Sequence, residues 1–226
     1  MGKILIPARG PEDWQQFLAE PDKQWKRGYS ARTLAYCWHD CDGFPAHVKK
    51  AFLSSEHFCD LNLLVAIPEH QVPLPPYNAP ASQNDIWILA RCATGLVSVA
   101  VEGKVSESFD KTLSEWNVKP SNGKTRRLDY LTSILGLERE LPGTIRYQLL
   151  HRTASAVIEA KRFSARHAVM LVHSFSQEDI WFSDYAAFVS LFGGIGVMDK
   201  IVAVRELDGV LLHFGWVRGE AKYLTM

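Results

Sequence analysis

Alternation of apolar and polar residues marks out the strands along the chain. The clearest case is the segment 96–105, where Val97 and Val99 lie on one face while Glu102 and Lys104 lie on the other. Shorter apolar runs bounded by turn residues indicate further strands. The predicted strands are 61–67, 85–93, 96–105, 167–174, 200–206 and 209–217.

Helical spacing and capping residues predict helices between these strands. The predicted helices are 29–41, 46–54, 106–116, 126–137, 144–162 and 183–192, with a capped start and a polar surface segment over 11–27. Residues 68–84 hold five prolines and are predicted to form a loop. This mixture of strands, hairpins and helices favours an α/β fold, with a mixed central β-sheet flanked by helices.

Length and composition fit one folded unit. The chain has 226 residues, 47% of them apolar and 22% charged, which suits a single α/β domain over 1–226. We expect a helical N-terminal segment over 1–55 and a core over 60–226. Lys and Arg number 25, as do Asp and Glu. This balance counts against broad non-specific binding to nucleic acid, but it leaves room for a local basic cleft.

Neither end of the chain predicts a membrane segment. The apolar run near the N-terminus is too short for a signal peptide, and no stretch approaches the roughly 18 to 20 apolar residues of a membrane span. The four cysteines suit a reducing compartment as free thiols. We therefore expect a cytoplasmic protein without membrane association.

One constellation of charged residues follows from the pairing of two predicted strands. If Thr94 and Gly95 form a two-residue turn, then Asp85 lies opposite Lys104 and diagonal to Glu102. Diagonal neighbours on one face of an antiparallel pair lie roughly 7–8 Å apart. Two carboxylates and an ammonium group would then converge at one end of the hairpin.

This arrangement resembles the PD-(D/E)xK nuclease superfamily, in a bacterial branch. The resemblance rests on Asn84-Asp85, sixteen intervening residues, and then Glu102-Gly103-Lys104, on two neighbouring strands. It implies a restriction-endonuclease-like core in which Asp85 and Glu102 hold Mg²⁺ (or Mn²⁺) and Lys104 is the catalytic cation. Hard oxygen ligands suit Mg²⁺, which lowers the pKa of bound water and neutralises charge on a phosphoryl group.

The resemblance also extends to other elements of the chain. Some members carry a Gln on a later helix, which matches Gln148, and some add an acidic residue earlier, for which Glu56 and Glu69 are candidates. The implied activity is hydrolysis of nucleic acid, DNA more than RNA, with a possible homodimer. Residues expected to contact phosphates are Lys124, Arg126, Arg127 and Arg152.

Three alternatives stay open at the level of sequence. The charged residues could form a salt-bridge ladder on a solvated sheet edge, with no ligand. The nuclease-like frame could be catalytically inactive and bind nucleic acid or a protein partner. A zinc site is also conceivable, and its ligands would be Cys37, Cys41, His57 and Cys59.

Overall fold

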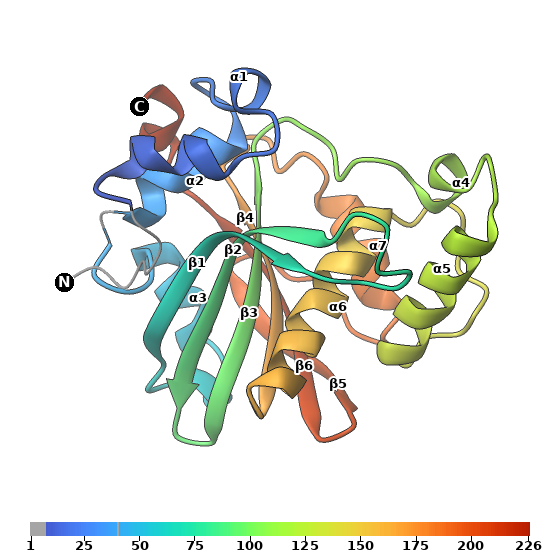
Figure 1. Ribbon diagram of the computed structural model, residues 1–226. Coiled ribbons are helices and arrows are strands. Elements are labelled where there is room, and N and C mark those ends of the chain that lie inside the picture. Colours follow the sequence, from blue (N-terminus) through green and yellow to red (C-terminus); the bar gives the residue numbers. More distant parts are fainter. Residues whose placement is uncertain (1–7, 40) are drawn as a thin grey trace.

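The computed structural model describes residues 8–39 and 41–226. At its centre lies a six-stranded sheet in the order β1-β2-β3-β4-β6-β5 (Figure 1). The strands are β1 Asn62–Val72, β2 Ser82–Cys92, β3 Gly95–Lys104, β4 His167–Ser174, β5 Lys200–Leu207 and β6 Val210–Arg218. Strands β3, β4 and β6 are mutually parallel, while β1, β2 and β5 join as antiparallel neighbours. The predicted mixed α/β sheet is confirmed.

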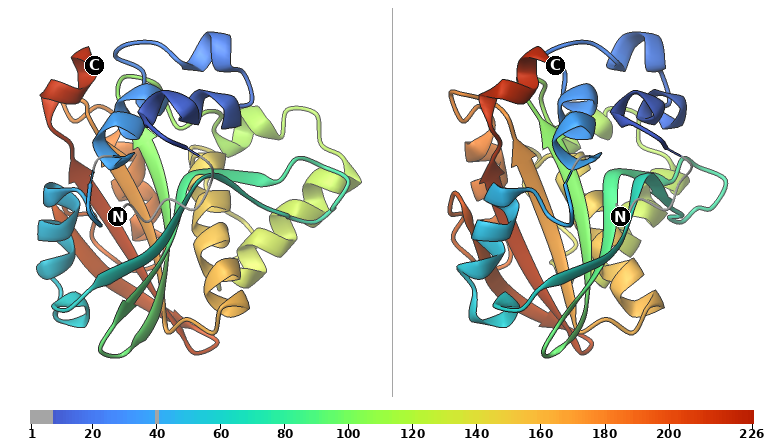
Figure 2. Two further views of the ribbon diagram at one scale, coloured as in Figure 1. Left: turned by 60° about the vertical axis from the view of Figure 1, so that its left-hand side comes forward. Right: turned by 90° about the vertical axis from the view of Figure 1, so that its left-hand side faces the viewer.

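Helices cover both faces of this sheet (Figures 1 and 2). They are η1 Pro11–Phe17, α1 Pro21–Gln24, α2 Ser30–His39, α3 Ala46–Leu53, η2 Glu56–Phe58, α4 Leu113–Trp116, α5 Asn122–Ile134, α6 Tyr147–Arg162, α7 Phe182–Ser190 and η3 Ala221–Thr225. The N-terminal helices pack on one face, and α5, α6 and α7 lie on the other. Within the described ranges, no helix is long and apolar enough to cross a membrane.

The central strand β4 shows why the sheet needs two covering layers. All eight of its residues are buried, as expected for a parallel strand with helices on both sides. Val169 and Leu171 pack with the N-terminal helices, whereas Met170 and Val172 pack with α6 and α7. The predicted strand over 167–174 agrees with the structure at both ends.

The register of the β2–β3 hairpin differs from the prediction by two residues. Cys92 pairs with Gly95, so Ala93 and Thr94 form the turn, and Ile86 pairs with Val101. The Ala93 amide and the Thr94 hydroxyl are held by Asp60 and His167 respectively, contacts from outside the hairpin. Because a shift of two residues leaves every side chain on its predicted face, Asp85 still faces the same side as Glu102.

Other predicted boundaries also differ from the structure; for example, the helix predicted over 126–137 is observed as α5 over Asn122–Ile134. The helix predicted over 106–116 is confined to α4, because Asp110 has a left-handed φ of 54° and a capping box of Thr112 and Glu115 sets the start of the helix. The loop predicted over 68–84 shrinks to 73–81, because β1 continues through Pro68. Strand β1 lies at the edge of the sheet, where proline removes no essential ladder bond.

The β1–β2 hairpin extends beyond the rest of the sheet. Its far end curves over α6 and reaches towards α5, as both figures of the whole chain show. Arg127 of α5 fixes this end by donating to the carbonyls of Leu74, Pro75 and Pro80 at 2.8–3.0 Å. The end of the hairpin therefore forms a wall beside the N-terminal half of α6.

Candidate functional site

The carboxyl end of β3 opens into a cleft of about 410 Å³. Strands β1 to β3, helix α6 and the N-terminal helices all contribute to its lining, including Asp85, Glu102, Lys104, Gln148 and Arg152. Ligands of open α/β sheets commonly bind outside the carboxyl ends of parallel strands. The cleft thus gathers every residue that the sequence placed in the catalytic set.

Three carboxylates occupy equivalent positions on three adjacent strands. In the β1–β2 ladder Pro68 pairs with Ile86 and His70 with Asn84, which sets Glu69 level with Asp85. Extending the β2–β3 register by one step from the Ile86–Val101 pair sets Asp85 level with Glu102. Glu69 also has a left-handed φ of 52°, an uncommon conformation for a residue with a side chain.

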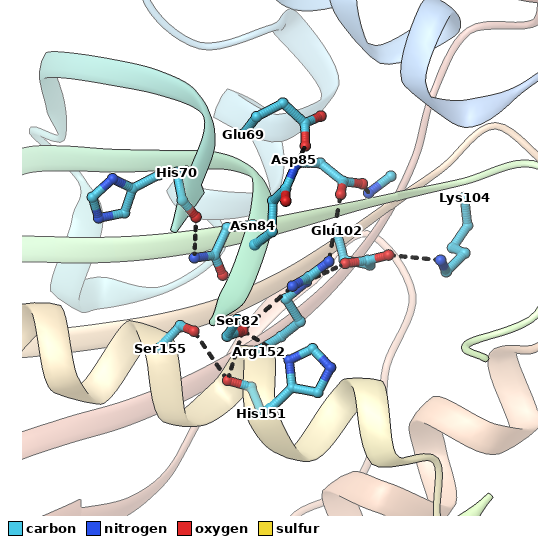
Figure 3. Close-up of polar contacts among 12 residues, drawn as sticks. Glu69, His70, Ser82, Asn84, Asp85, Glu102, Lys104, His151, Arg152 and Ser155 are labelled. Atoms are coloured by element: carbon cyan, nitrogen blue, oxygen red, sulfur yellow. Dashed lines mark hydrogen bonds and ion pairs between the residues drawn. The ribbon is translucent and has the colours of Figure 1, made fainter. Parts of the chain in front are cut away.

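Glu102 is buried and forms two ion pairs. Its Oε1 lies 2.6 Å from Lys104 Nζ and its Oε2 lies 2.5 Å from Arg152 Nε (Figure 3). The side chains of Glu102, Lys104 and Arg152 are 2%, 5% and 8% exposed. The alternative of a salt-bridge ladder on a solvated edge was therefore wrong, since Glu102 and Lys104 are buried on the interior strand β3 and Arg152 is buried on the covering helix α6.

The guanidinium of Arg152 contacts side chains of both β2 and β3. Besides Glu102, it contacts Asp85 Oδ1 at 3.7 Å through Nη2 and donates to Ser82 Oγ at 3.3 Å through Nη1. Figure 3 shows it between the end of β2 and Glu102, projecting from α6. Its pKa is raised: burial opposes the charge, but Glu102 and Asp85 outweigh that penalty. The sequence marked Arg152 for phosphate contact but did not anticipate this bridge.

Asp85 and Glu69 are costly to ionise, because the site compensates a negative charge on either carboxyl poorly. Burial and the neighbouring Glu102 raise the pKa of Asp85 to about 7, although its Oδ2 accepts the Gly103 amide at 2.7 Å. Burial and the charge of Asp85 raise the pKa of Glu69 to about 8. For Glu102, burial is opposed by Arg152 and Lys104, and its pKa is lowered. Perturbed groups of this kind in a cleft are candidates for function.

Gln148 and Glu107 bring unsatisfied polar atoms to the cleft. Gln148 Oε1 and Glu107 Oε1 are both buried without a hydrogen-bond partner. Glu107 Oε2 accepts the Val105 amide at 3.2 Å. Buried polar atoms are nearly always paired in folded proteins, so these two oxygens are available to a ligand. Gln148 thus lies where the sequence predicted, on the helix that faces the acidic residues.

The other predicted phosphate contacts have separate roles. Arg127 is buried, and its donors are committed to the 73–81 loop, which corrects its expected role. Lys124 donates to the carbonyls of Trp116 and Lys119. Arg126 is exposed on α5. Glu56 lies in η2, beside His57, whose ring packs near the first residue of β4, so it lies at the opposite end of the sheet.

Two residues that the sequence did not place in the site adjoin it. Ser82 Oγ lies 2.7 Å from His151 Nδ1 and also contacts Arg152. Burial, followed by the nearby Arg152 charge, lowers the pKa of His151 well below its ordinary value, so the ring is neutral at pH 7. The end of the hairpin brings Ser82 to His151 and Arg152 from about 70 positions earlier in the chain, and no local spacing in the sequence indicates this contact.

The donor chemistry of the cleft suits Mg²⁺ as a two-carboxylate site. Mg²⁺ is commonly held by one or two carboxylates together with water and substrate phosphate. Asp85 Oδ1 accepts no hydrogen bond within 3.5 Å from the residues that the structure describes, and each Glu102 oxygen has a second lone pair. Among the described residues, no three His, Cys, Asp or Glu side chains form a metal-holding group, so a third protein ligand is not preassembled.

The cysteines considered as zinc ligands do not form a metal site among the described residues, since Cys37, Cys41, Cys59 and His57 make no metal-holding group within 8–39 and 41–226. Cys41 Sγ instead donates to the Cys37 carbonyl at 2.9 Å on α2. Burial raises the pKa of Cys37, as expected for a thiol that packs as a small apolar side chain.

Comparison with known proteins identifies the family but no function. Searches among curated proteins and among solved structures gave no match. A family described as a domain of unknown function, DUF6946, matches residues 7–221. The match spans the sheet, both helical layers and the whole acidic cleft. The chain therefore belongs to the DUF6946 family.

Proposed function

We propose that the protein is a Mg²⁺-dependent (or Mn²⁺-dependent) phosphodiester hydrolase acting on nucleic acid. The observation that supports this proposal best is the convergence of Asp85, Glu102 and Lys104 in a cleft at the carboxyl end of β3. The reaction that we propose, hydrolysis of a phosphodiester bond, is the one implied by the resemblance of these residues to the PD-(D/E)xK pattern. The meander β1-β2-β3, followed by the parallel strand β4, is compatible with the restriction-endonuclease-like core that we propose.

In this proposal Asp85 and Glu102 hold the metal ion. When bound, Mg²⁺ supplies Lewis-acid polarisation of the phosphate and lowers the pKa of a bound water. The site favours a cation because the half-buried Asp85 and Glu69 lie near one another and near Glu102, with raised pKa values. Binding a divalent cation would relieve the repulsion among these carboxylates.

Lys104 and Arg152 provide the positive charge that a phosphate requires. Both lie at the cleft and are held in place by Glu102, so little side-chain entropy is lost when they meet an anion. Fixed cations in a buried site stabilise charge that develops on a phosphoryl oxygen more strongly than they would in water. Gln148, with its unpartnered Oε1, is placed to orient a water or a substrate hydrogen-bond donor.

Calorimetric titration of Mn²⁺ tests the metal, and Mg²⁺-dependent cleavage of single- and double-stranded DNA and RNA tests the reaction. We expect one defined binding event in the wild type that is lost in Asp85→Asn, along with cleavage. Asn can still accept the Gly103 amide, so the variant should fold. Asp129→Asn, at a surface ion pair with Arg139, is the matched control and should bind and cleave normally. Cleavage that persists in Asp85→Asn would refute the assignment.

DNA is the substrate that the resemblance favours over RNA, and a homodimer is its expected form for cutting two strands. The cleavage assay separates the two nucleic acids directly. Sedimentation of the protein with and without a short DNA duplex separates a monomer from a dimer. A monomer that cuts only single strands would remove the reason for proposing a dimer.

One feature favours a second candidate function, a catalytically inactive module that binds nucleic acid or a protein. Arg152 already supplies a positive charge between Asp85 and Glu102, the position where a metal would be needed. A guanidinium that neutralises the two acids is compatible with a site that has no need of a metal. Binding of nucleic acid without Mn²⁺ uptake or cleavage would select this function over the hydrolase.

A further inference from the structure

A second cavity lies on the other side of the β2 terminus from the acidic cleft. Its volume is also about 410 Å³. The 73–81 loop forms one wall with Pro76 and Pro80, and α4, α5 and α6 form the rest with Trp116, Lys124 and Tyr147. The proline-rich loop and two of the predicted phosphate contacts, Lys124 and Arg127, therefore line a cavity that is separate from the proposed metal site.

The walls of this cavity are flat, aromatic and cationic. The rings of Trp116 and Tyr147 stack with centroids 4.3 Å apart and an interplanar angle of 16°. Lys124 Nζ lies 5.2 Å from the centre of the Trp116 ring. Stacking on aromatic side chains is the sequence-tolerant way in which proteins hold nucleic-acid bases, and cations on such rings strengthen it.

The opposite wall is held rigid before any ligand arrives. Three donors of Arg127 bind the carbonyls of Leu74, Pro75 and Pro80. These hydrogen bonds hold the proline-rich loop against α5, across the cavity from Trp116 and Tyr147. A cavity formed in advance loses little entropy on binding, which favours a flat, rigid occupant.

A chain of polar contacts joins this cavity to the acidic cleft. Ser82 and His151 line the cavity, and Ser82 Oγ lies 2.7 Å from His151 Nδ1. Ser82 also accepts a hydrogen bond from Arg152 Nη1, while Arg152 Nε binds Glu102. A single guanidinium therefore reaches from Ser82 to Glu102 (Figure 3). Ser82 lines the cavity and Glu102 lines the acidic cleft, so one side chain contacts both sites.

We propose that this cavity receives a base of the nucleic-acid substrate, next to the phosphate held at Asp85, Glu102 and Lys104. The inference rests on the proposed function for its substrate class. The base packs against the wall formed by the stacked pair Trp116 and Tyr147, and its polar edge meets the hydroxyl of Ser82 and the ring of His151. The cavity therefore sets which nucleotide lies beside the reacting phosphate, and it acts as a specificity site.

Calorimetry with a nucleoside 5′-monophosphate and with ribose 5-phosphate tests the base directly. Neither ligand holds a phosphodiester bond, so Mg²⁺ can be present without turnover. We expect the wild type to bind at least one of the four nucleotides about tenfold more tightly than the sugar phosphate, a difference of about 1.4 kcal/mol. Equal affinity of the sugar phosphate and all four nucleotides, or no binding of any, would overturn the proposal.

Ala79→Trp fills the cavity without touching the acidic cleft, because Ala79 lies in the 73–81 loop and lines only the cavity. We expect this variant to lose the preference for the base and to keep Mn²⁺ binding. Ala187→Trp, at an exposed position on α7, adds the same side chain elsewhere and should bind like the wild type. A preference that survives in Ala79→Trp would also overturn the proposal.

The two proposals fail in different ways. If Mn²⁺ binds and nucleic acid is cleaved but no nucleotide is preferred to ribose 5-phosphate, the base site is refuted and the hydrolase stands. If the preference exists and depends on Ala79, yet no metal binds and nothing is cleaved, the hydrolase is refuted and the cavity belongs to a non-catalytic nucleic-acid-binding module.

Discussion

Asp85 shows most clearly how the site departs from the most stable arrangement. Its carboxyl is largely buried, faces the negative charge of Glu102, and has a pKa of about 7. Arg152 reaches it only at 3.7 Å, whereas Glu102 takes the shorter contacts with both cations. A side chain that is costly to ionise and yet is retained in a cleft is typical of a functional group.

This environment predicts that Asp85→Asn stabilises the protein at alkaline pH. A carboxyl whose pKa is higher in the folded than in the unfolded protein stabilises the fold at low pH. That stabilisation is lost as pH rises through the pKa of the folded state. For Asp85 the loss runs from about pH 4 to about 7. In metal-free buffer, urea unfolding should therefore show a larger free energy of unfolding for the variant than for the wild type at pH 8, and a smaller difference at pH 4.

Asp129→Asn is the control for this comparison, because its carboxyl is 43% exposed beside Arg139. Its free energy of unfolding should follow that of the wild type within about 0.5 kcal/mol at both pH values. If Asp85→Asn were less stable than the wild type at pH 8, Asp85 would be stabilising the fold as an ionised partner of Arg152, and the description of the site as poorly compensated would be wrong.

At the level of elements, the β1–β2 hairpin is the part of the chain that ties the two cavities together. Its side chains alternate along β2, so Ser82 lines the aromatic cavity while Gln83 and Asp85 line the acidic cleft. Gln83 donates to Glu69 at 2.7 Å on the neighbouring strand. The end of the hairpin must therefore keep its position relative to α6 for either site to keep its shape.

Arg127→Lys should loosen this hairpin end. Lysine offers a compact ammonium group in place of the planar fork, so it cannot reach the carbonyls of Leu74, Pro75 and Pro80 together. We expect a loss of about 1–3 kcal/mol in the free energy of unfolding, because the buried carbonyl of Leu74 and the partly buried contacts to Pro75 and Pro80 lose their donors. Hydrogen exchange and limited proteolysis should increase locally over 73–81.

Arg126→Lys on the exposed side of α5 is the matched control, and it should change neither stability nor exchange. Local loosening in Arg127→Lys should also weaken the preference for a nucleotide over ribose 5-phosphate, since the loop wall is no longer fixed. An unchanged exchange rate over 73–81 in that variant would show that the proline-rich loop holds its shape without the arginine.

On the scale of the whole molecule, buried histidines connect the sheet to its covering layers. His173 of β4 is fully buried, and its Nδ1 accepts the indole N–H of Trp38 from α2 at 3.0 Å. His167 and His213 lie on neighbouring parallel strands, with 3.0 Å between Nδ1 and Nε2. Burial lowers the pKa of His167 to about 4 and the pKa values of His173 and His213 to about 3.

These histidines predict acid destabilisation of the fold. A histidine whose pKa is depressed on folding contributes full stability above its ordinary value of about 6.5 and loses it as pH falls towards the folded value. The raised pKa values of Asp85 and Glu69 have the opposite effect, because these acids add stability as pH falls. A variant of one histidine therefore separates the contribution of that histidine from theirs. His173→Gln, which can still accept the Trp38 N–H, should make the fall in unfolding free energy between about pH 6 and 4 shallower than in the wild type.

His47→Gln serves as the control, because His47 is 51% exposed on α3. Its stability profile should keep the slope of the wild type. If the profile of His173→Gln kept that slope as well, His173 would not take up a proton on unfolding, and the acid limb would have to come from His167 and His213.

The sequence alone determined that the strands exist, which faces they present and which residues make up the candidate site. Strict alternation fixed the side of the sheet that carries Glu102 and Lys104, because the strand period is two and survives a register shift of two. Gln148 and Arg152 are four positions apart on α6, which is the spacing of neighbours on one helical face. The proposed acid and cation set follows from these local rules.

Only the tertiary structure decided how those residues are partnered. The turn register depends on contacts from Asp60 and His167 outside the hairpin, so the sequence paired Asp85 with Lys104 rather than with Glu102. The bridge from Arg152 to the carboxylates joins residues 50 and 67 positions apart. Burial, which raises the pKa of Asp85 and commits Arg127 to the loop, depends on long-range packing that no local pattern records.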